Sequence, residues 1–333
     1  MVGNASVVDA FRDFGDKWYY LKLQSGWAVL GLVGFFVISR INYQRLEILA
    51  RPLLIVCIGL LCLVLLPGVG VRLLGARRWI NLGPVGFQPS ELIKFGLVLY
   101  WARLFMQKEW LKTFLVTLVG VAGLVMLQPD MGTTIIIVGI AAIMYFGAGG
   151  KILPMAGIGG ALALGFLLLV MLSPYRLARM KTFFDYTADP QGSSYHIRQV
   201  LLSIGSGGMW GVGIGQSRQK YEFLPEVTTD SIFAVVAEET GLVGGLVLIS
   251  VYASLIFLGL SVYARAKNHF GRNLALGITA WLGMQVVINL GAMTALVPLT
   301  GVPLPFISYG GSALVINLLA SGLLVSVARS EEK

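Results

Sequence analysis

About nine long apolar runs, separated by polar segments, constrain the fold of this chain more than any other feature of its sequence. A helix needs roughly 17 to 25 apolar residues to cross a bilayer, and lipid-exposed backbone must satisfy its hydrogen bonds internally. The pattern therefore predicts an all-α integral membrane protein, a polytopic helical bundle of about nine spans that forms one domain over residues 1–333. The runs lie near residues 22–39, 52–68, 90–106, 112–128, 132–149, 152–173, 230–262, 272–297 and 312–328.

The composition agrees with a membrane protein and argues against a protein that binds nucleic acid. Hydrophobic residues make up 56% of the chain and charged residues 12%, and the 42 glycines fit closely packed membrane helices. Basic cytoplasmic loops and anionic lipid explain the net charge of +9. Cys57 and Cys62 lie in one apolar run, which excludes a disulfide framework and a zinc-binding spacing.

Lysine and arginine residues in the short loops predict the orientation of the chain in the membrane. Counting spans puts most of these residues on one side, the cytoplasm, with the C-terminus inside and the N-terminus outside. Because the N-terminus is then outside, either an opening span is missing from this sequence or the protein inserts unusually, and we favour the missing span. Residues 2–22 form an amphipathic, aromatic approach to the membrane interface, and the run 230–262 is long enough to begin with a helix outside the hydrocarbon.

The segments on the outer side carry positive charge against this bias. Arg77 and Arg78 lie in one outer loop, and further basic residues occupy a large extracytoplasmic loop between about 174 and 229. Positive charge retained there favours an anionic ligand, and a pair of guanidinium groups can grip a diphosphate. The alternative is that long loops translocate regardless of their charge.

Asp230 stands where the polar loop enters the next apolar run, and it is the candidate general base. Partial desolvation raises the pKa of a carboxylate toward the operating pH, which suits base catalysis. Glu222 and Glu226 can tune or assist it. The structural alternative, which the sequence supports equally, is an N-cap formed by Thr228-Thr229-Asp230 at the start of a helix.

Further carboxylates lie inside apolar runs, where an unpaired charge is costly. Glu238 and Glu239 follow Asp230 by about two helical turns, and one of them should face the bundle interior beside a cation such as Lys94. Pairing of Lys94 with Glu91 or with Glu238 is the structural alternative to a lysine that binds phosphate at the membrane surface.

Glycine and proline interrupt the spans at residues 75–90, 128–134 and 298–312. Irregular backbone at membrane depth is tolerated where it is buried in protein or lines a cavity, so these segments are candidates for lining a site. Asp130 can also serve simply as a helix cap. The glycine tract 205–215 lacks the context of a nucleotide-binding loop, and flexible packing is its expected role.

The sequence contains no apparent metal-binding constellation. His196 and His269 fall on opposite sides of the predicted membrane. No cofactor is therefore assigned, although a divalent cation such as Mg²⁺ or Mn²⁺, held by carboxylates and substrate phosphates, is left open.

Six motifs follow one another along the chain: Gly75-Ala76-Arg77-Arg78-Trp79-Ile80, Gln88-Pro89-Ser90-Glu91-Leu92, Gln128-Pro129-Asp130-Met131-Gly132-Thr133, Asp189-Pro190-Gln191-Gly192-Ser193, Ile204-Gly205-Ser206-Gly207-Gly208 and Pro303-Leu304-Pro305-Phe306-Ile307-Ser308-Tyr309-Gly310-Gly311-Ser312. With these motifs the chain resembles the SEDS family of bacterial shape, elongation, division and sporulation proteins, from about Phe14 to Arg329. Residues 211–220 resemble the division branch of the family, FtsW, more than the elongation branch, RodA.

The resemblance implies a ten-span fold, of which the first span is absent from this sequence, and a peptidoglycan glycosyltransferase. Such an enzyme polymerises lipid II, an undecaprenyl-pyrophosphoryl disaccharide-peptide, into β-1,4 glycan strands at the outer face of the cytoplasmic membrane. Asp230 matches the family's essential carboxylate, which implies an inverting transfer in which it deprotonates the acceptor's 4-hydroxyl. The residues implied to bind substrate are Arg77, Arg78, Lys94, Glu222, Gln88, Ser90, Ser308, Tyr309, Gly310, Gly311 and Ser312.

The sequence departs from the family pattern at a few positions. Val227-Thr228 stands where Ala-His or Gln-His is common, Ala313 replaces a frequent serine, and Gly86 stands where many members carry a basic residue. These departures keep the candidate base, but they leave open which cation meets the phosphate.

The resemblance also implies partners and a location. These are a class B penicillin-binding protein transpeptidase, other divisome proteins, and the bacterial inner membrane at the division septum. Two other functions stay open: a lipid II flippase, since broken helices and intramembrane charges mark transporters, and a non-catalytic division scaffold. The polar residues gather on one outer face and no internal repeat is evident, which favours the enzyme.

Overall fold

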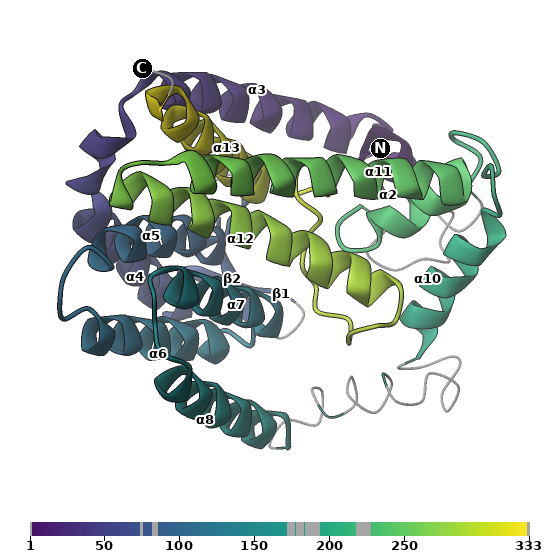
Figure 1. The fold of residues 1–333 in the computed structure, drawn as a ribbon. Coiled ribbons are helices and arrows are strands. Elements are labelled where there is room, and N and C mark those ends of the chain that lie inside the picture. Colours follow the sequence, from purple (N-terminus) through teal and green to yellow (C-terminus); the bar gives the residue numbers. More distant parts are fainter. Residues whose placement is uncertain are drawn as a thin grey trace. The chain divides into compact units, whose positions relative to one another are not determined.

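The computed structural model describes residues 2–73, 76–81, 86–171, 177, 183, 194–217 and 228–331 (Figure 1). These residues separate into two compact units, each built from three stretches of the chain. The first unit comprises residues 1–22, 149–252 and 286–309, and the second comprises 23–148, 253–285 and 310–333. Each unit is described by itself, and the single domain expected from the sequence stays a prediction.

Every predicted apolar run coincides with a helix in the described part of the chain. The helices α3, α11, α12 and α13 are long and apolar enough to cross a membrane, and α4, α6 and α7 are shorter apolar helices. The chain is therefore a helical, polytopic membrane protein, as predicted. The bounds are α3 Tyr19–Arg40, α4 Ala50–Leu65, α5 Pro89–Leu104, α6 Leu111–Leu127, α7 Met131–Gly147, α8 Ile152–Met171, α11 Ile232–Arg265, α12 His269–Met293 and α13 Gly311–Glu331.

The N-terminal residues form two short helices, α1 Val2–Ala5 and α2 Val7–Phe14, before the first long apolar helix. Helix α2 ends at Gly15, which adopts the left-handed conformation. The Asp16 carboxylate accepts a hydrogen bond from Lys22 Nζ at 2.7 Å, and this bond, with one from the backbone N–H of Trp18, lowers the pKa of Asp16. The predicted aromatic approach is thus an ordered helical segment that leads into α3.

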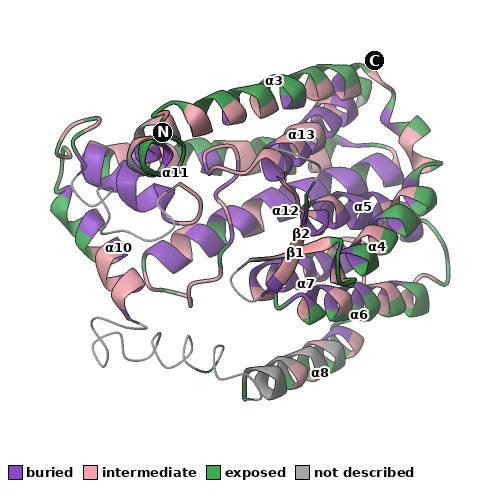
Figure 2. Ribbon diagram, turned by 180° about the vertical axis from the view of Figure 1, so that it is seen from behind, coloured by how far each residue is buried: buried purple, intermediate pink, exposed green. Residues whose placement is uncertain are grey.

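The second unit is built around α5, which is buried along most of its length (Figure 2). Helix α5 contacts α4, α6, α7 and α13, and the 3-10 helix η1, Tyr43–Glu47. A small antiparallel sheet of order β1-β2-β3 precedes it, formed by Gly70–Leu73, Ala76–Asn81 and Gly86–Phe87. The sequence predicted irregular backbone here, and the sheet adds strand pairing that no alternation of apolar residues announced.

The first unit has its hydrophobic core around the first turns of α11. Ile232, Phe233 and Val235 of α11 pack with Val200 of α10, the helix Tyr195–Ser206, and with Leu304. The core therefore joins the described part of the predicted extracytoplasmic loop to the segment that follows α12. Residues 184–193 and 218–227 of that loop lie outside the described residues.

Helix α11 is broken at Gly241, whose φ of 69° and ψ of −168° are not helical. Residues 231–239 are all buried, whereas an exposed face begins at Leu242. Backbone groups at such a break lose helical partners and must find others. The long run thus consists of two helical pieces, and the location of the first piece outside the hydrocarbon stays a prediction.

The glycine tract after α10 supplies the missing partners. Val212 N–H donates to Glu238 O at 3.0 Å, and Leu242 N–H donates to Gly208 O at 2.9 Å. A Cβ at Gly211 would lie 2.2 Å from Glu239 O, so the two backbones approach too closely for any side chain at that position. Specific backbone contacts thus replace the flexible packing that the sequence led us to expect.

Candidate functional site

The backbone of residues 228–230, just before α11, is held by donors from a distant part of the sequence. Tyr309 N–H donates to Thr228 O at 2.8 Å, and Ser308 Oγ donates to Thr229 O at 2.5 Å. Asn289 Nδ2 completes the row by donating to Asp230 O at 3.0 Å. We call these three donors the carbonyl clamp. It fixes the backbone of the segment that carries the candidate base.

Asn289 occupies the centre of this arrangement. Its side-chain nitrogen also donates to Val302 O at 2.8 Å, so one amide joins the start of α11 to the segment after α12. The residue is only 1% exposed, and its Oδ1 has no hydrogen-bond partner within the described part of the chain. A buried, unsatisfied acceptor is uncommon and calls for an explanation such as a water or a ligand.

The backbone of Gly301 lies close to the carboxylate of Asp230. A Cβ at this position would lie 3.3 Å from Asp230 Oδ2, and the φ of +71° is one that glycine adopts without strain. The neighbouring Thr300 Oγ1 is buried and, among the residues described, has no hydrogen-bond partner. Asp230 itself is half-buried. The carboxylate thus borders a polar, closely packed loop.

Ser308 and Tyr309 hold the loop as well as the base segment. The hydroxyl of Ser308 accepts a hydrogen bond from Leu304 N at 2.8 Å, which closes a turn. The ring of Tyr309 meets that of Tyr20 edge-on at 5.0 Å, and burial raises the pKa of the Tyr309 hydroxyl to about 12, with Tyr20 and Tyr19 adding to the rise. Tyr309 therefore stays neutral at physiological pH.

The remaining residues of this motif, Gly310, Gly311 and Ser312, belong to the second unit. Gly310 N–H donates to Gln24 Oε1 at 3.3 Å, and a Cβ at Gly311 would lie 2.2 Å from Trp27 Nε1. Both glycines thus contribute to packing on α3. Ser312 Oγ is buried without a hydrogen-bond partner in the described chain.

Helix α10 also supports the start of α11. His196 Nε2 lies 2.8 Å from Ser231 Oγ, directly after the candidate base. Two turns farther along α11, Ser203 and Ser217 donate to Glu238 Oε2 at 3.1 and 2.5 Å. Of the two partners considered for Lys94, the structure shows Glu91, which lies in the same unit.

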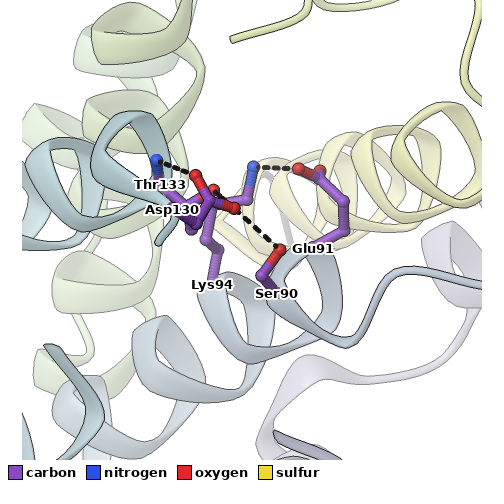
Figure 3. A network of polar contacts seen from close by, with 5 residues as sticks. All are labelled: Ser90, Glu91, Lys94, Asp130 and Thr133. Carbon is purple, nitrogen blue, oxygen red and sulfur yellow. Dashed lines mark hydrogen bonds and ion pairs between the residues drawn. The ribbon is translucent and has the colours of Figure 1, made fainter. Parts of the chain in front are cut away.

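A second group of polar side chains lies in the second unit, where α5 meets the start of α7 (Figure 3). Lys94 Nζ pairs with Glu91 Oε1 at 2.8 Å, and both side chains are almost wholly buried. Asp130 accepts from the backbone N–H of Thr133 at 3.1 Å and from its hydroxyl at 2.9 Å, and Ser90 Oγ lies 3.5 Å away. We call these five residues the α5–α7 network. Asp130 is a helix cap, as one alternative predicted.

Lys94 has a further contact with α12, since its Nζ lies 5.3 Å from the centroid of the Trp281 ring. Trp281 Nε1 and Glu91 Oε2 are both buried without a hydrogen-bond partner among the described residues. Unpaired polar atoms around a buried charge leave bonding capacity for water or a polar ligand. The ion pair of Lys94 with Glu91 is therefore a structural contact, and the polar atoms around it can also bind water or a polar ligand.

Arg77 and Arg78, the predicted diphosphate-binding pair, lie half-buried on β2 and bond to ends of helices. Arg77 donates to Leu65 O at 3.4 Å, at the end of α4, and Arg78 Nε donates to Gln128 O at 3.0 Å, at the end of α6. Arg78 also donates to Pro129 O. Cations at helix C-termini satisfy the last carbonyls and oppose the helix dipole, so both arginines have a structural role.

The other predicted site residues fall in two groups. Gln88 is half-buried at the N-cap position of α5 without a side-chain cap bond. Glu222 lies outside the described residues. Within the described ranges, no three histidine, cysteine, aspartate or glutamate side chains come together as a metal site.

Sequence reasoning missed two residues of the site, Asn289 and Gly301. A signal existed for Asn289, because a polar amide inside the apolar run 272–297 must find partners in the bundle. For Gly301 the sequence predicted only a turn, because a glycine between two prolines is typical of turns. Neither position revealed that its partner would be the Asp230 segment.

The sequence of this chain is similar to a known protein family and to named bacterial relatives. Residues 1–333 match the FtsW/RodA/SpoVE family, described as cell cycle protein. The chain is 38% identical to stage V sporulation protein E of Bacillus subtilis, over 99% of this chain and 92% of the relative. It is 39% identical to the probable peptidoglycan glycosyltransferase FtsW of Trichlorobacter lovleyi, over 98% and 88%.

Solved structures show the same fold. A chain from a study of how a peptidoglycan synthase complex coordinates polymerization and crosslinking matches with a TM-score of 0.80 and 31% identity, covering 100% of this chain and 95% of that one. The rod shape determining protein RodA of Thermus thermophilus matches with a TM-score of 0.70 and 30% identity, covering 100% and 94%.

Proposed function

Because this chain belongs to the FtsW/RodA/SpoVE family of cell cycle proteins, we propose that it is a peptidoglycan glycosyltransferase that polymerises lipid II into β-1,4 glycan strands. Relatives of similar length bear the name of that activity, and this chain matches them over nearly its whole length. A polytopic membrane protein suits a lipid-linked substrate, because the substrate's isoprenoid tail stays in the bilayer while its sugars lie outside.

Asp230 is the general base in this proposal. It removes the proton of the acceptor's 4-hydroxyl while the oxygen attacks the anomeric carbon of the donor. The bond from that carbon to the pyrophosphate oxygen breaks, and undecaprenyl pyrophosphate leaves with the electron pair. Attack from the opposite face converts the α-linked donor into a β-linked product. A positioned base contributes roughly 10²- to 10⁴-fold to such a step.

The single observation that carries this assignment is the carbonyl clamp. Three consecutive carbonyls, ending at Asp230, are each bound by a donor from Asn289, Ser308 or Tyr309. Catalytic groups need a fixed position, and a side chain mounted on rigid backbone is better positioned than one on a loose loop. Nearby unpaired acceptors, Asn289 Oδ1 and Thr300 Oγ1, provide bonding capacity that hydroxyls of a sugar can use.

The departing pyrophosphate needs positive charge. We assign Lys94 to this role, with Arg77 and Arg78 supporting it through the nitrogen donors that their carbonyl bonds leave over. Since the described residues contain no group of three histidine, cysteine, aspartate or glutamate ligands, a divalent cation would rest on one or two carboxylates together with substrate phosphates, as Mg²⁺ often does. No step of the mechanism depends on such a cation.

We further propose a partner and a location. A class B penicillin-binding protein would crosslink the strand that this chain polymerises, in agreement with the synthase complex among the structural relatives. Septal peptidoglycan synthesis, with Asp230 on the outer face of the bacterial inner membrane, is the corresponding place of action. The FtsW relatives support the division role.

The test is polymerisation of fluorescent lipid II by the purified protein, alone and with its transpeptidase, read as glycan chains on a gel. Asp230→Asn keeps the size of the side chain and removes the base, so polymer formation should fall at least about 10²-fold. Thermal unfolding should stay unchanged.

A matched control is Asp16→Asn, which changes a partly exposed aspartate of the same unit that binds Lys22 and the backbone N–H of Trp18. Its polymerase activity should equal that of the wild type. Undiminished glycan synthesis by Asp230→Asn would reject the mechanism. Movement of lipid II between leaflets by a protein without polymerase activity would instead support a flippase.

A further inference from the structure

The loop that follows α10 exposes a run of apolar side chains. Trp210 is 80% exposed, Ile214 77% and Met209 57%, although none of these side chains is polar. Large, contiguous exposed apolar groups mark a surface that contacts something other than water. We define the exposed loop as residues 207–215.

Several backbone groups of this loop are satisfied by α11, which separates it from an ordinary water-exposed loop. Val212 N–H and Gly213 N–H donate to the carbonyls of Glu238 and Glu239 at 3.0 and 3.1 Å. In the opposite direction, Leu242 N–H donates to Gly208 O at 2.9 Å and Val243 N–H donates to Met209 O at 3.2 Å. Non-helical backbone can lie in a membrane only when protein satisfies its polar groups.

The loop lies where the surroundings of α11 change. Residues 231–239 are buried, and exposed apolar side chains begin at Leu242 and continue with Leu246 and Val247. A membrane-spanning helix exposes such a face to lipid. Counting back from Arg265, about 20 residues at 1.5 Å each cross a hydrocarbon core of about 30 Å and end near Gly245. The break and its loop therefore fall at the boundary between hydrocarbon and water.

We propose that the exposed loop is a membrane anchor, with Trp210, Ile214 and Met209 seated among the lipids of the leaflet nearest Asp230. We infer lipid as the partner of the loop because the loop continues the lipid-facing surface of α11 across the break in that helix. No residue from Met209 to Ile214 has a polar side chain. Tryptophan is the residue most suited to this depth, since its ring is amphipathic.

The anchor also sets the height of the candidate base. The buried piece of α11 from Ile232 to Gly241 extends about 13 Å along its axis, so Asp230 is carried beyond the anchored loop toward the aqueous side. Sugars of a lipid-linked substrate lie at that level. This inference concerns the position of the loop and does not depend on the glycosyltransferase proposal.

The experiment uses the full-length protein in liposomes and the fluorescence of Trp210. The chain has seven tryptophans, so the contribution of Trp210 is taken as the difference between wild type and Trp210→Phe. Phosphatidylcholine brominated at shallow or deep acyl positions quenches from the lipid, and acrylamide quenches from water. We expect a blue-shifted difference spectrum that shallow bromines quench several-fold more than acrylamide does.

Two further variants make the result decisive. Ile214→Trp in the Trp210→Phe background should report the same lipid quenching from the other end of the loop. The control is the fluorescence of Trp101, taken as the difference between wild type and Trp101→Phe. Trp101 is fully buried, so neither quencher should reduce its fluorescence. A Trp210 component quenched by acrylamide and not by bromine would overturn the proposal, as would one quenched by neither, which would show that protein covers the loop.

Discussion

Asp230 and Asp130 each stand just before an apolar helix, and the structure shows different contacts for the two residues. Asp130 is bound through its carboxylate, which accepts hydrogen bonds from Thr133 and lies beside Ser90. Asp230 is held through its backbone by the carbonyl clamp. A cap uses its oxygens to complete a helix, whereas a base needs a fixed position and oxygens that can receive a proton. The carboxylate of Asp130 thus caps α7, and side chains remote in the sequence fix the backbone of the candidate base, although the sequence presents both aspartates as possible caps.

The comparison extends to the regions around them. The α5–α7 network consists of side chains that bind one another, so removing one partner should lower stability, and removing Lys94 should also take away the charge proposed for the pyrophosphate. The carbonyl clamp consists of donors to backbone, so removing one should affect position and activity as well. Three variants test this division.

The largest effect on stability is expected for Lys94→Met. It leaves the carboxylate of Glu91, which is 2% exposed, without its cation, and breaking a buried pair in this way costs about 3–5 kcal/mol. Unfolding in detergent micelles measures the loss. The double variant Glu91→Gln with Lys94→Met removes both charges and should recover most of it. A single-variant loss below about 1 kcal/mol would show that the pair is not a structural unit.

Asn289→Ala should lower both stability and activity. The carbonyls of Asp230 and Val302 lose their donor, at a cost of about 1–3 kcal/mol, and a displaced base can lower turnover by up to about 10²-fold. The control is Asn273→Ala, in the same helix, which removes one buried bond to Ala102 O. Unfolding and lipid II polymerisation are measured for both. Equal turnover in the two variants would contradict a positioning role for the clamp.

The smallest effect is expected for Gly301→Ala. Its positive φ makes a side chain strained by about 1 kcal/mol, and the new Cβ would crowd Asp230 Oδ2. Gly15→Ala is matched in φ, at +69°, but meets nothing within 4 Å. Both variants should lose similar stability in thermal unfolding, and only Gly301→Ala should lose polymerase activity. Loss of activity in Gly15→Ala as well would assign the effect to strain alone.

The fold was largely predictable because its strongest signals are local. A long apolar run must become a helix in lipid, and a carboxylate three residues before a backbone N–H can cap one, as Asp130 does for Thr133. The sheet around Arg77 and Arg78 was not predicted, because its short strands lack an alternating pattern. The use of those arginines at the ends of α4 and α6 was also hidden, since it depends on which carbonyls fold beside them.

The sequence by itself determined the class of the protein, its nine apolar helices, its resemblance to a family and the identity of the candidate base. Only the tertiary structure decided how that base is held, because its partners are remote: Asn289 is 59 residues from Asp230, and Ser308 is 79 from Thr229. The structure likewise showed that residues 207–215, the exposed loop, form the backbone hydrogen bonds that α11 loses at its break at Gly241. Hydrophobic length is a property of the chain, whereas hydrogen-bond partnership between remote segments arises only when the chain is packed.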